Sequence, residues 1–444
     1  MSEASEAKLP FGALRESIRR AAETTEDPFE AFNAAQGMGA IRDPYPIFAA
    51  MRASAPVHRI DLAALGGGAG PGPFEGAAPG GAARMAPAGS ELWLALTYDA
   101  VHEVLADDDR FDSSGYVNSM GQVMGHSILE MDGSEHTRAR NLINRAFSRR
   151  ALERWEHELV RPVVDAYVDR FCERGSADLV RELTFPFPVR VIAGMLGLDE
   201  SDFADFHRWA IELISVMIDW DRALSASANL GRLFGRLVEE RRAAPREDLL
   251  SILATARVDG ASLDDEAIFA FGRLLAPAGA ETTYRSSSNL LFGLLSNPEQ
   301  LEAVRADRSL IPPCIEEGLR WEPPLLTIMR TATRDTELCG VAIPKGGPVT
   351  VNMGSANRDP AYWNDPDRFD VFRAAHPHLA FAFGRHLCLG QHLARMETRV
   401  VLETLFDRLP GLRLDPEAQD VHVTGMVFRA PQSLPVRFDP TPPR

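Results

Sequence analysis

One cysteine near the carboxyl end of the chain lies in a segment whose residue types suit metal binding. Cys388 has Gly384 before it and Gly390 after it, and apolar residues then recur at the three- to four-residue spacing of an amphipathic helix. The thiol should therefore lie at or just before a helix N-terminus, where free amides and the helix dipole favour a thiolate and lower its pKa. The glycines would let a large flat group approach the backbone.

Two other interpretations of this cysteine remain open from the segment alone. His376, His378, His386 and His392 accompany Cys388, and a cluster of histidine and cysteine can hold zinc. Zinc gives the glycines no role, however, and no Cys-x-x-Cys pair is present. The thiol could also be a buried and chemically inert core side chain.

A second segment combines helix-disturbing residues with an acid and an alcohol. An apolar run over about 267–295 predicts one long buried helix, and its middle reads Pro277-Ala278-Gly279-Ala280-Glu281-Thr282. Because Pro277 lacks an N–H and Gly279 loosens the next turn, we expect the helix to bulge and leave carbonyls free for water. Glu281 and Thr282 could relay protons there. Alone, they could also be a surface carboxylate and a hydroxyl bonded to its own helix.

Charged residues at helical spacing form two further patterns. Glu317 and Arg320 lie three residues apart before two prolines and should share one helix face, although an isolated pair of this kind is a weak signal. His136 and Arg140 lie four residues apart in another predicted helix.

Together, these segments resemble those of the cytochrome P450 family. Residues 381–390 are similar to the family's cysteine loop, Phe-Gly-x-Gly-x-His-x-Cys-x-Gly, and depart from it at Ala382, where the family usually has glycine. Residues 278–282 match the family's oxygen-activation motif, Ala-Gly-x-Glu/Asp-Thr. Because both motifs occur in the family's order, a haem-bound thiolate is favoured over zinc or an inert cysteine.

The resemblance implies roles for individual residues. Cys388 would be the axial ligand of the iron of haem b, and Glu281 and Thr282 would be the catalytic acid and alcohol. The expected haem contacts, some of them basic groups for the two propionates, are His136, Arg140, Arg330, His386, Phe381, Gly384, Gly390, Ala278 and Gly279. The expected structural scaffold on the cysteine side of the haem is Glu317, Arg320 and Arg368, the last in a segment similar to the family's Pro-Glu-Arg-Phe turn.

The expected substrate pocket is almost wholly apolar. The resemblance places its walls at Tyr116, Met120, Met217, Leu275, Leu326, Ile328 and Val427. Such a lining suits a terpenoid, steroid, aromatic or fatty acyl compound, held by burial of apolar area with few polar anchors. Each of these residues could equally be plain core.

The implied activity is that of a monooxygenase that inserts one oxygen atom of O₂ into a hydrophobic small molecule, by hydroxylation or epoxidation. Electrons would come from NAD(P)H through separate proteins of the ferredoxin and ferredoxin reductase type. An acidic iron–sulfur protein could dock on a basic patch of Arg138, Arg145, Arg149, Arg150, Arg385 and Arg395. Two alternatives are an enzyme that uses peroxide or catalyses a rearrangement, and a haem-binding sensor or carrier without turnover.

Sequence patterning predicts a mainly α fold with small peripheral β-sheets, and the resemblance places the haem between the long kinked central helix and the cysteine-loop helix. Strand signals occur at 93–97, 349–352 and 434–438. We expect a poorly ordered segment at 1–30 and a single domain over 31–444, interrupted by an insertion rich in glycine, alanine and proline at 63–90.

Bulk properties limit the partners and the compartment. A formal net charge of −16 argues against binding to nucleic acid. The N-terminus reads as neither a signal peptide nor a membrane anchor, and the four scattered cysteines form no disulfide framework. We therefore expect a cytoplasmic protein, and the resemblance suggests a monomer.

Overall fold

The computed structural model describes residue 33 and residues 41–61, 91–214, 219–257 and 262–444. The expected poorly ordered segment at 1–30, the insertion at 63–90 and Met217 lie outside the described residues.

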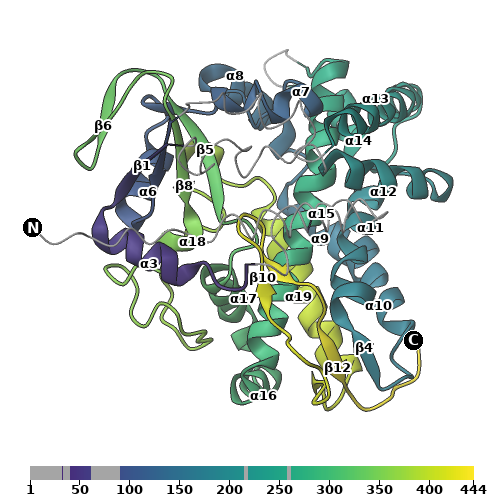
Figure 1. The fold of residues 1–444 in the computed structure, drawn as a ribbon. Helices are drawn as coiled ribbons and strands as arrows, with labels where there is room; N and C mark the ends of the chain where they lie inside the picture. The colour runs from purple at the N-terminus through teal and green to yellow at the C-terminus, as the bar shows by residue number, and fades with distance from the viewer. Residues whose placement is uncertain (1–32, 34–40, 62–90, 215–218, 258–261) are drawn as a thin grey trace, which may run out of the picture.

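Helices make up most of the described chain, as the sequence predicted (Figure 1). The first group is α3 (Tyr45–Ser54), α6 (Tyr98–Ala106), α7 (Met120–Met124), α8 (Gly133–Asn144), α9 (Arg149–Trp155), α10 (Arg161–Asp169), α11 (Pro186–Met195) and α12 (Glu200–Ile214). The second is α13 (Trp220–Ala243), α14 (Leu249–Thr255), α15 (Asp265–Leu295), α16 (Pro298–Ala306), α17 (Ile311–Trp321), α18 (Met353–Ala356) and α19 (Gln391–Arg408).

The strands form small separate sheets. They are β1 (Val57–Asp61), β2 (Glu91–Ala95), β3 (Phe111–Asp112), β4 (Ser176–Asp178), β5 (Thr327–Ala332), β6 (Thr336–Leu338), β7 (Val341–Ile343), β8 (Pro348–Asn352), β9 (Arg413–Leu414), β10 (Val423–Thr424), β11 (Ala430–Pro431) and β12 (Pro435–Arg437). The expected strands at 93–97, 349–352 and 434–438 are thus found as β2, β8 and β12, within a few residues.

The largest sheet has five strands in the order β1-β2-β8-β5-β3, with β2 and β8 parallel and the other neighbours antiparallel. In Figure 1 this sheet lies at the left, helices α10 to α14 lie at the right, and α15 and α19 lie between them. The two helices that carry the predicted motifs therefore occupy the middle of the molecule.

Helix α15 is buried along almost its whole length. Asp264 caps it by accepting a hydrogen bond from the amide of Ala267 at 2.8 Å. Apolar residues lie on every side of the helix, so it can be packed on all sides. The helices around it are α11, α12, α13, α17 and α19. The expected bulge does not form, and the helix runs on through Pro277. Packing on all sides offsets the cost of an internal proline, about 3 kcal/mol.

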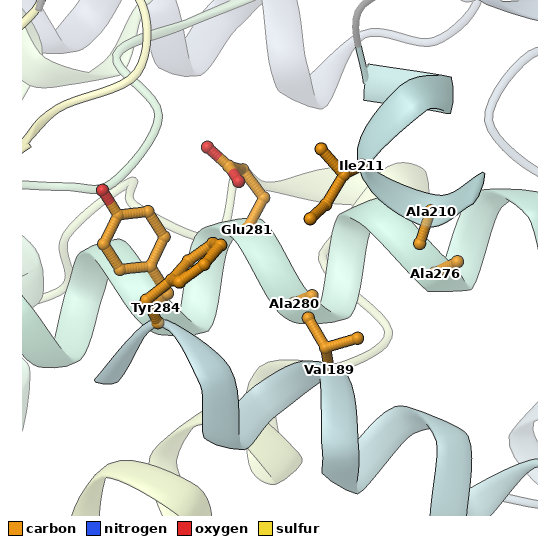
Figure 2. Close-up of a pocket in the computed structure, with 8 residues that line it drawn as sticks. Val189, Ala210, Ile211, Ala276, Ala280, Glu281 and Tyr284 are labelled. Carbon is orange, nitrogen blue, oxygen red and sulfur yellow. The ribbon is translucent and has the colours of Figure 1, made fainter. Parts of the chain in front are cut away.

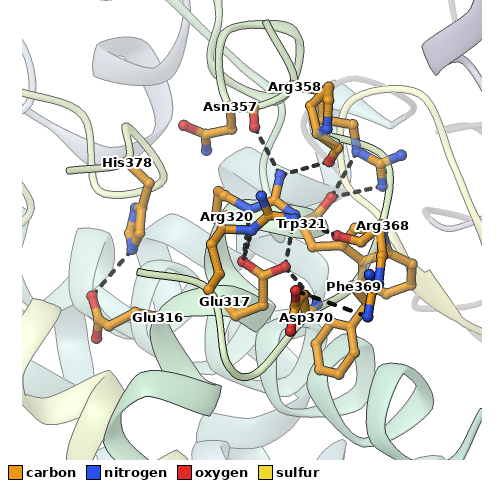
Figure 3. A network of polar contacts seen from close by, with 12 residues as sticks. Glu316, Glu317, Arg320, Trp321, Asn357, Arg358, Arg368, Phe369, Asp370 and His378 are labelled. Atoms are coloured by element: carbon orange, nitrogen blue, oxygen red, sulfur yellow. Dashed lines mark hydrogen bonds and ion pairs between the residues drawn. The ribbon is translucent and has the colours of Figure 1, made fainter. Parts of the chain in front are cut away.

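A buried ion pair on α17 fastens the segment that leads to the cysteine loop (Figure 3). Arg320 binds both carboxylate oxygens of Glu317, at 2.7 and 2.8 Å. Its remaining N–H groups reach the carbonyl oxygens of Asn357 at 3.0 Å, Pro366 at 2.7 Å and Arg368 at 3.0 Å. The planar guanidinium can satisfy these acceptors together, so the pair holds a loop that lies far away in sequence.

The third side chain of this network is that of Arg373, which corrects the expectation for Arg368. The side chain of Arg368 is 66% exposed and comes no closer than 4.0 Å to a carboxylate oxygen of Asp370, and only its carbonyl enters the network. Arg373 instead donates to Glu317 at 3.1 Å and to the carbonyl oxygen of Arg368 at 2.9 Å. The chain turns between the two arginines, so sequence position alone did not show which one points inward.

The cysteine loop contains a strained residue where the family usually has glycine. Ala382 has a φ of +60°, in the left-handed region that disfavours any side chain. Its amide donates to the carbonyl oxygen of Leu379 at 2.9 Å. Gly384 has a φ of +73°, and a Cβ there would lie 2.3 Å from the carbonyl oxygen of Leu105. The loop thus needs glycine at 384 and tolerates alanine at 382 at a cost in backbone energy.

Replacing Arg373 should weaken the network far more than replacing Arg368. Arg373→Ala removes a charge-assisted hydrogen bond from the buried Glu317, so we expect a loss of about 2–3 kcal/mol in the free energy of unfolding. Arg368→Ala should change it by less than about 0.5 kcal/mol, because that side chain is exposed. Urea unfolding followed by circular dichroism measures both, and equal losses would contradict the assignment.

Relieving the backbone strain at Ala382 should stabilise the protein. We expect Ala382→Gly to raise the free energy of unfolding by about 0.5–1 kcal/mol, because the steric cost of the left-handed conformation exceeds the added freedom of the unfolded chain. Ala380→Gly is the matched control, since Ala380 does not have a positive φ, and it should destabilise the protein by about 0.5–1 kcal/mol. A loss of stability in both variants would show that Ala382 is unstrained.

Candidate active site

Cys388 lies between a short 3₁₀ turn (Gly384–His386) and the start of α19 at Gln391, as the sequence predicted. Its backbone amide donates to the carbonyl oxygen of Phe381 at 3.0 Å, which closes the loop. The amides of Gly390 and Gln391 hydrogen-bond to its sulfur. The thiol therefore faces the free N–H groups of a helix N-terminus.

The expected lowering of the thiol pKa is not seen in the chain by itself. Burial raises the pKa of Cys388, and this effect outweighs the opposing influence of the Gly390 and Gln391 amides and of Arg140 and Arg395. The position at a helix N-terminus predicted a lower pKa, but loss of hydration around the sulfur has the larger effect. A half-buried thiol with donors aimed at it is nonetheless well suited to bind a cation as the thiolate.

Basic side chains without a countercharge gather near this thiol. His136 and Arg140 lie on α8 and Arg330 lies on β5. In the described part of the chain, neither Arg140 nor Arg330 pairs with a carboxylate; they donate to the carbonyl oxygens of Leu387 at 2.6 Å and Met329 at 2.7 Å. Burial lowers the pKa of both arginines, so their charges would be stabilised by an anion.

His136 and His386, the two histidines near Arg140, differ in their contacts. Both ring nitrogens of His136 are buried without a hydrogen-bond partner in the described chain. Burial lowers its pKa to about 4, with the neighbouring cations His386, Arg140 and Arg385 acting in the same direction. His386, whose ring centre lies 4.3 Å from that of His136, contacts Asp132 at 3.0 Å and Ser113 at 3.1 Å. His136 therefore has unused hydrogen-bonding capacity, whereas His386 has protein partners.

These observations fit a haem whose two propionates are anionic. Within the described ranges, Arg140 and Arg330 form no ion pair, and the ring nitrogens of His136 have no hydrogen-bond partner. Ala278 is exposed although most of α15 is buried, and a Cβ on Gly390 would meet no atom within 4 Å. A planar group could therefore approach both α15 and the cysteine loop. The zinc interpretation receives no support, since no group of three or more potential metal-ligating side chains converges in the described residues.

Two of the expected haem contacts have other roles in this structure. A Cβ on Gly279 would lie 2.5 Å from the side chain of Ile192, so this glycine permits close packing of α15 on α11. Gly384 lies against the carbonyl oxygen of Leu105, as described above. The side chain of Phe381 is half-buried and lies under the guanidinium of Arg395, 4.4 Å from the ring centre. Gly279 and Gly384 thus let neighbouring protein segments pack closely.

The acid and the alcohol on α15 have different surroundings. The hydroxyl of Thr282 donates to the carbonyl oxygen of Ala278 at 2.7 Å, so it is bonded to its own helix. Glu281 is buried and accepts a hydrogen bond from Arg285 at 2.6 Å. Arg285 was missed by the sequence analysis, although its four-residue spacing from Glu281 was a usable signal. The acid is therefore a buried ion-paired group and not a surface carboxylate.

The residues expected to line the substrate pocket are only partly brought together. Leu275 lies on α15, Ile328 on β5 and Met120 at the start of α7. The hydroxyl of Tyr116 accepts a hydrogen bond from the Met329 amide at 3.1 Å.

Leu326 does not fit the expectation, because its side chain is fully buried in a separate core cluster with Tyr45, Phe48 and Leu96. Its amide donates to the carbonyl oxygen of Val427 at 2.8 Å, which joins this strand segment to the C-terminal hairpin.

A small cavity on another face of α15 is lined by Glu281 and by residues that were not predicted as site residues (Figure 2). It lies between α15, α11 and α12, and Glu281 and Tyr284 form part of its wall. The other lining residues are Phe185, Val189, Ala210, Ile211, Ala276 and Ala280. Because Ala276, Ala280 and Tyr284 repeat every four residues, they form one stripe, and Ala278 and Thr282 lie on another.

No helix in the described ranges is long and apolar enough to span a membrane.

Comparison with known proteins identifies the family. The family model described as cytochrome P450 matches residues 187–419. The chain is 34% identical to the cytochrome P450 monooxygenase PikC of Streptomyces venezuelae, over 94% of this chain and 96% of that protein. It is 34% identical to a steroid C26-monooxygenase of Mycobacterium tuberculosis, over 79% of this chain and 96% of that protein.

A solved structure of CYP109E1 from Bacillus megaterium, in complex with testosterone, has a TM-score of 0.76 and 30% identity, and the match covers 89% of this chain and 99% of that one. Together with the cysteine loop and the helix that carries the acid and alcohol, these matches show that the chain belongs to the cytochrome P450 family.

Proposed function

We propose that this oxidoreductase binds haem b through Cys388 and inserts one oxygen atom of O₂ into a hydrophobic small molecule. The single observation that carries the proposal is a half-buried thiol that is faced by helix amides and lies beside Arg140. Neither Arg140 nor Arg330 forms an ion pair in the described part of the chain. Arg140 and Arg330 would hold the propionates by charge, and His136 would bind one of them through its free ring nitrogen. Haem, when bound, supplies the chemistry that activates O₂.

Glu281 and Thr282 would supply protons to the oxygen site. The hydroxyl of Thr282 is bonded to the carbonyl oxygen of Ala278 at 2.7 Å and must leave it before it can donate elsewhere. Both contacts of Arg285 with Glu281 use Oε1, so the other carboxylate oxygen would be the one that exchanges a proton. Thr282 thus has a resting hydrogen bond that must be exchanged during turnover.

Substrate class and electron donors belong to the same proposal. The apolar residues Leu275, which is buried, and Ile328 and Met120, which are half-buried, favour a hydrophobic substrate. One relative is named as a steroid monooxygenase, and another has been solved with testosterone.

Electrons would arrive from a ferredoxin-type protein at the exposed arginines 138, 145 and 150. Of the other three predicted patch members, Arg385 pairs with Asp108, Arg395 with Glu316 and Arg149 with Glu153. We infer a single-domain, monomeric, cytoplasmic enzyme.

The peroxide-using and ligand-sensing alternatives are less well supported. Neither activity needs an acid and an alcohol on the helix that faces the haem, and Glu281 is held there by a buried ion pair that is costly to maintain. A monooxygenase uses both groups.

Replacing the proposed ligand should abolish the thiolate spectrum. In the reduced carbon monoxide complex of the purified protein we expect the strongly red-shifted Soret band of thiolate-bound haem. Cys388→His should lose this band, because an imidazole cannot donate the same charge to the iron. Cys314→Ala is the control, since that thiol is fully buried in the core and its burial raises its pKa. Persistence of the band in the histidine variant would disprove the assignment.

Removing the alcohol should separate oxygen consumption from product formation. With a hydrophobic compound found by its shift of the haem spin state, Thr282→Ala should form about tenfold less product per O₂ and release peroxide, because the proton donor is lost. Thr282→Ser should retain most of the product yield. An unchanged yield in the alanine variant would contradict the proton role.

A further inference from the structure

Helix α19 contains a buried acid that the proposed mechanism does not use. Glu397 is 1% exposed. Its Oε2 accepts a hydrogen bond from the hydroxyl of Thr283 at 3.2 Å, and its Oε1 is buried without a partner in the described chain. A buried polar atom without a partner opposes folding, so this acid requires an explanation.

The partner of Glu397 connects the two helices of the site. Thr283 lies on α15 directly after Thr282, whereas Glu397 lies on α19, which begins just after Cys388. Among the described residues, the contact between Thr283 and Glu397 is the one side-chain hydrogen bond that joins α15 to α19. Apolar residues of both helices belong to the same core cluster, and a hydrogen bond adds a directional contact to this packing.

The arginines on and near α19 form ion pairs with carboxylates other than that of Glu397. Arg395 pairs with Glu316 of α17, and Arg399 pairs with Glu156 and Glu403. Farther along, Arg161 of α10 pairs with Glu403, and Arg408 pairs with Asp165 and Asp169. None of these groups perturbs Glu397: burial raises the pKa of Glu397 to about 8, and the hydrogen bond from Thr283 opposes the shift. The carboxyl group is therefore uncharged at neutral pH.

We propose that Glu397 is a positioning residue whose uncharged carboxyl group, hydrogen-bonded to Thr283, sets the spacing between α15 and α19 and thereby between Thr282 and Cys388. The proposal rests on the proposed function, which places a haem between these two residues. An uncharged carboxyl group needs little hydration and can both donate and accept at this contact, whereas a carboxylate with one buried oxygen unpaired cannot be satisfied there.

Loss of the proton should disturb the packing between the two helices, because it places a charge on a buried group. The unfolded chain releases it near the ordinary pKa of 4.5, whereas the folded protein keeps it up to about pH 8. Folded protein therefore binds one more proton than unfolded chain between these values, and stability falls as pH rises through that window. One proton of difference corresponds to about a tenfold decrease in the folding equilibrium constant per pH unit. Above pH 8 the carboxylate should keep the hydrogen bond from Thr283, which favours the charged form, and should draw water to its unpaired Oε1.

The test compares Glu397→Gln, which cannot titrate, with the wild-type holoprotein. The first readout is stability from urea unfolding between pH 6 and pH 9. The second is the infrared stretching band of carbon monoxide bound to the reduced haem, which reports the groups beside the ligand. In the wild type we expect the band to shift with a midpoint near pH 8. In Glu397→Gln the band should be independent of pH. The stability of this variant should also fall less between pH 6 and pH 8 than that of the wild type.

Two further variants separate positioning from a simple packing role. Thr283→Val keeps the shape and removes the hydrogen bond that favours the carboxylate, so its band should differ from the wild-type band below pH 8 and its midpoint should lie at a higher pH. Glu403→Gln, on the same helix but in a half-buried ion-pair network, should titrate like the wild type. A wild-type band that does not move with pH, or a Glu397→Gln band that moves as the wild type does, would overturn the proposal. Neither result would affect the assignment of Cys388, which its own spectrum tests.

Discussion

The pair formed by Glu317 and Arg320 is the interaction on which the rest of the site depends. Arg320 ties α17 to the carbonyl oxygens of the chain at 357–368, and Asn357 in turn receives the amide of Leu379 at 2.8 Å. Leu379 opens the cysteine loop, so the position of Cys388 follows from a buried ion pair that takes no part in chemistry. Because both charges are buried and hydrogen-bonded, this anchor is stiff and would be costly to break.

The pKa values of the groups near the thiol depend on burial as much as on neighbouring charges. Burial raises the pKa of Cys388 and lowers the pKa of Arg140, Arg330 and His136, so every group near the site is held in surroundings that oppose its charged form. An iron cation beside the sulfur and two carboxylates beside the basic groups would relieve these costs together. The fold thus prepares a site that is more stable with a charged planar ligand than without one.

Helix α15 separates two environments because successive stripes of its surface meet different neighbours. Ala278 and Thr282 lie on the stripe proposed to face the haem, whereas Ala276, Ala280 and Tyr284 line a cavity against α11 and α12. Glu281 lies at the boundary, held by Arg285. A proton could therefore pass from the cavity around the helix without crossing the haem pocket, provided that the resting hydrogen bonds exchange.

Sequence alone determined the parts that depend on local chemistry: the helix over 265–295, the cysteine before α19, the acid and alcohol, and the pairing of Glu317 with Arg320. These follow from spacing along a single segment. Only the tertiary structure decided that Arg373 and not Arg368 completes the network, that Leu326 is core, that Gly279 packs on α11, and that burial governs the pKa of Cys388. Each of these depends on which distant segment surrounds the side chain, because desolvation and packing are set by neighbours that the local pattern does not encode.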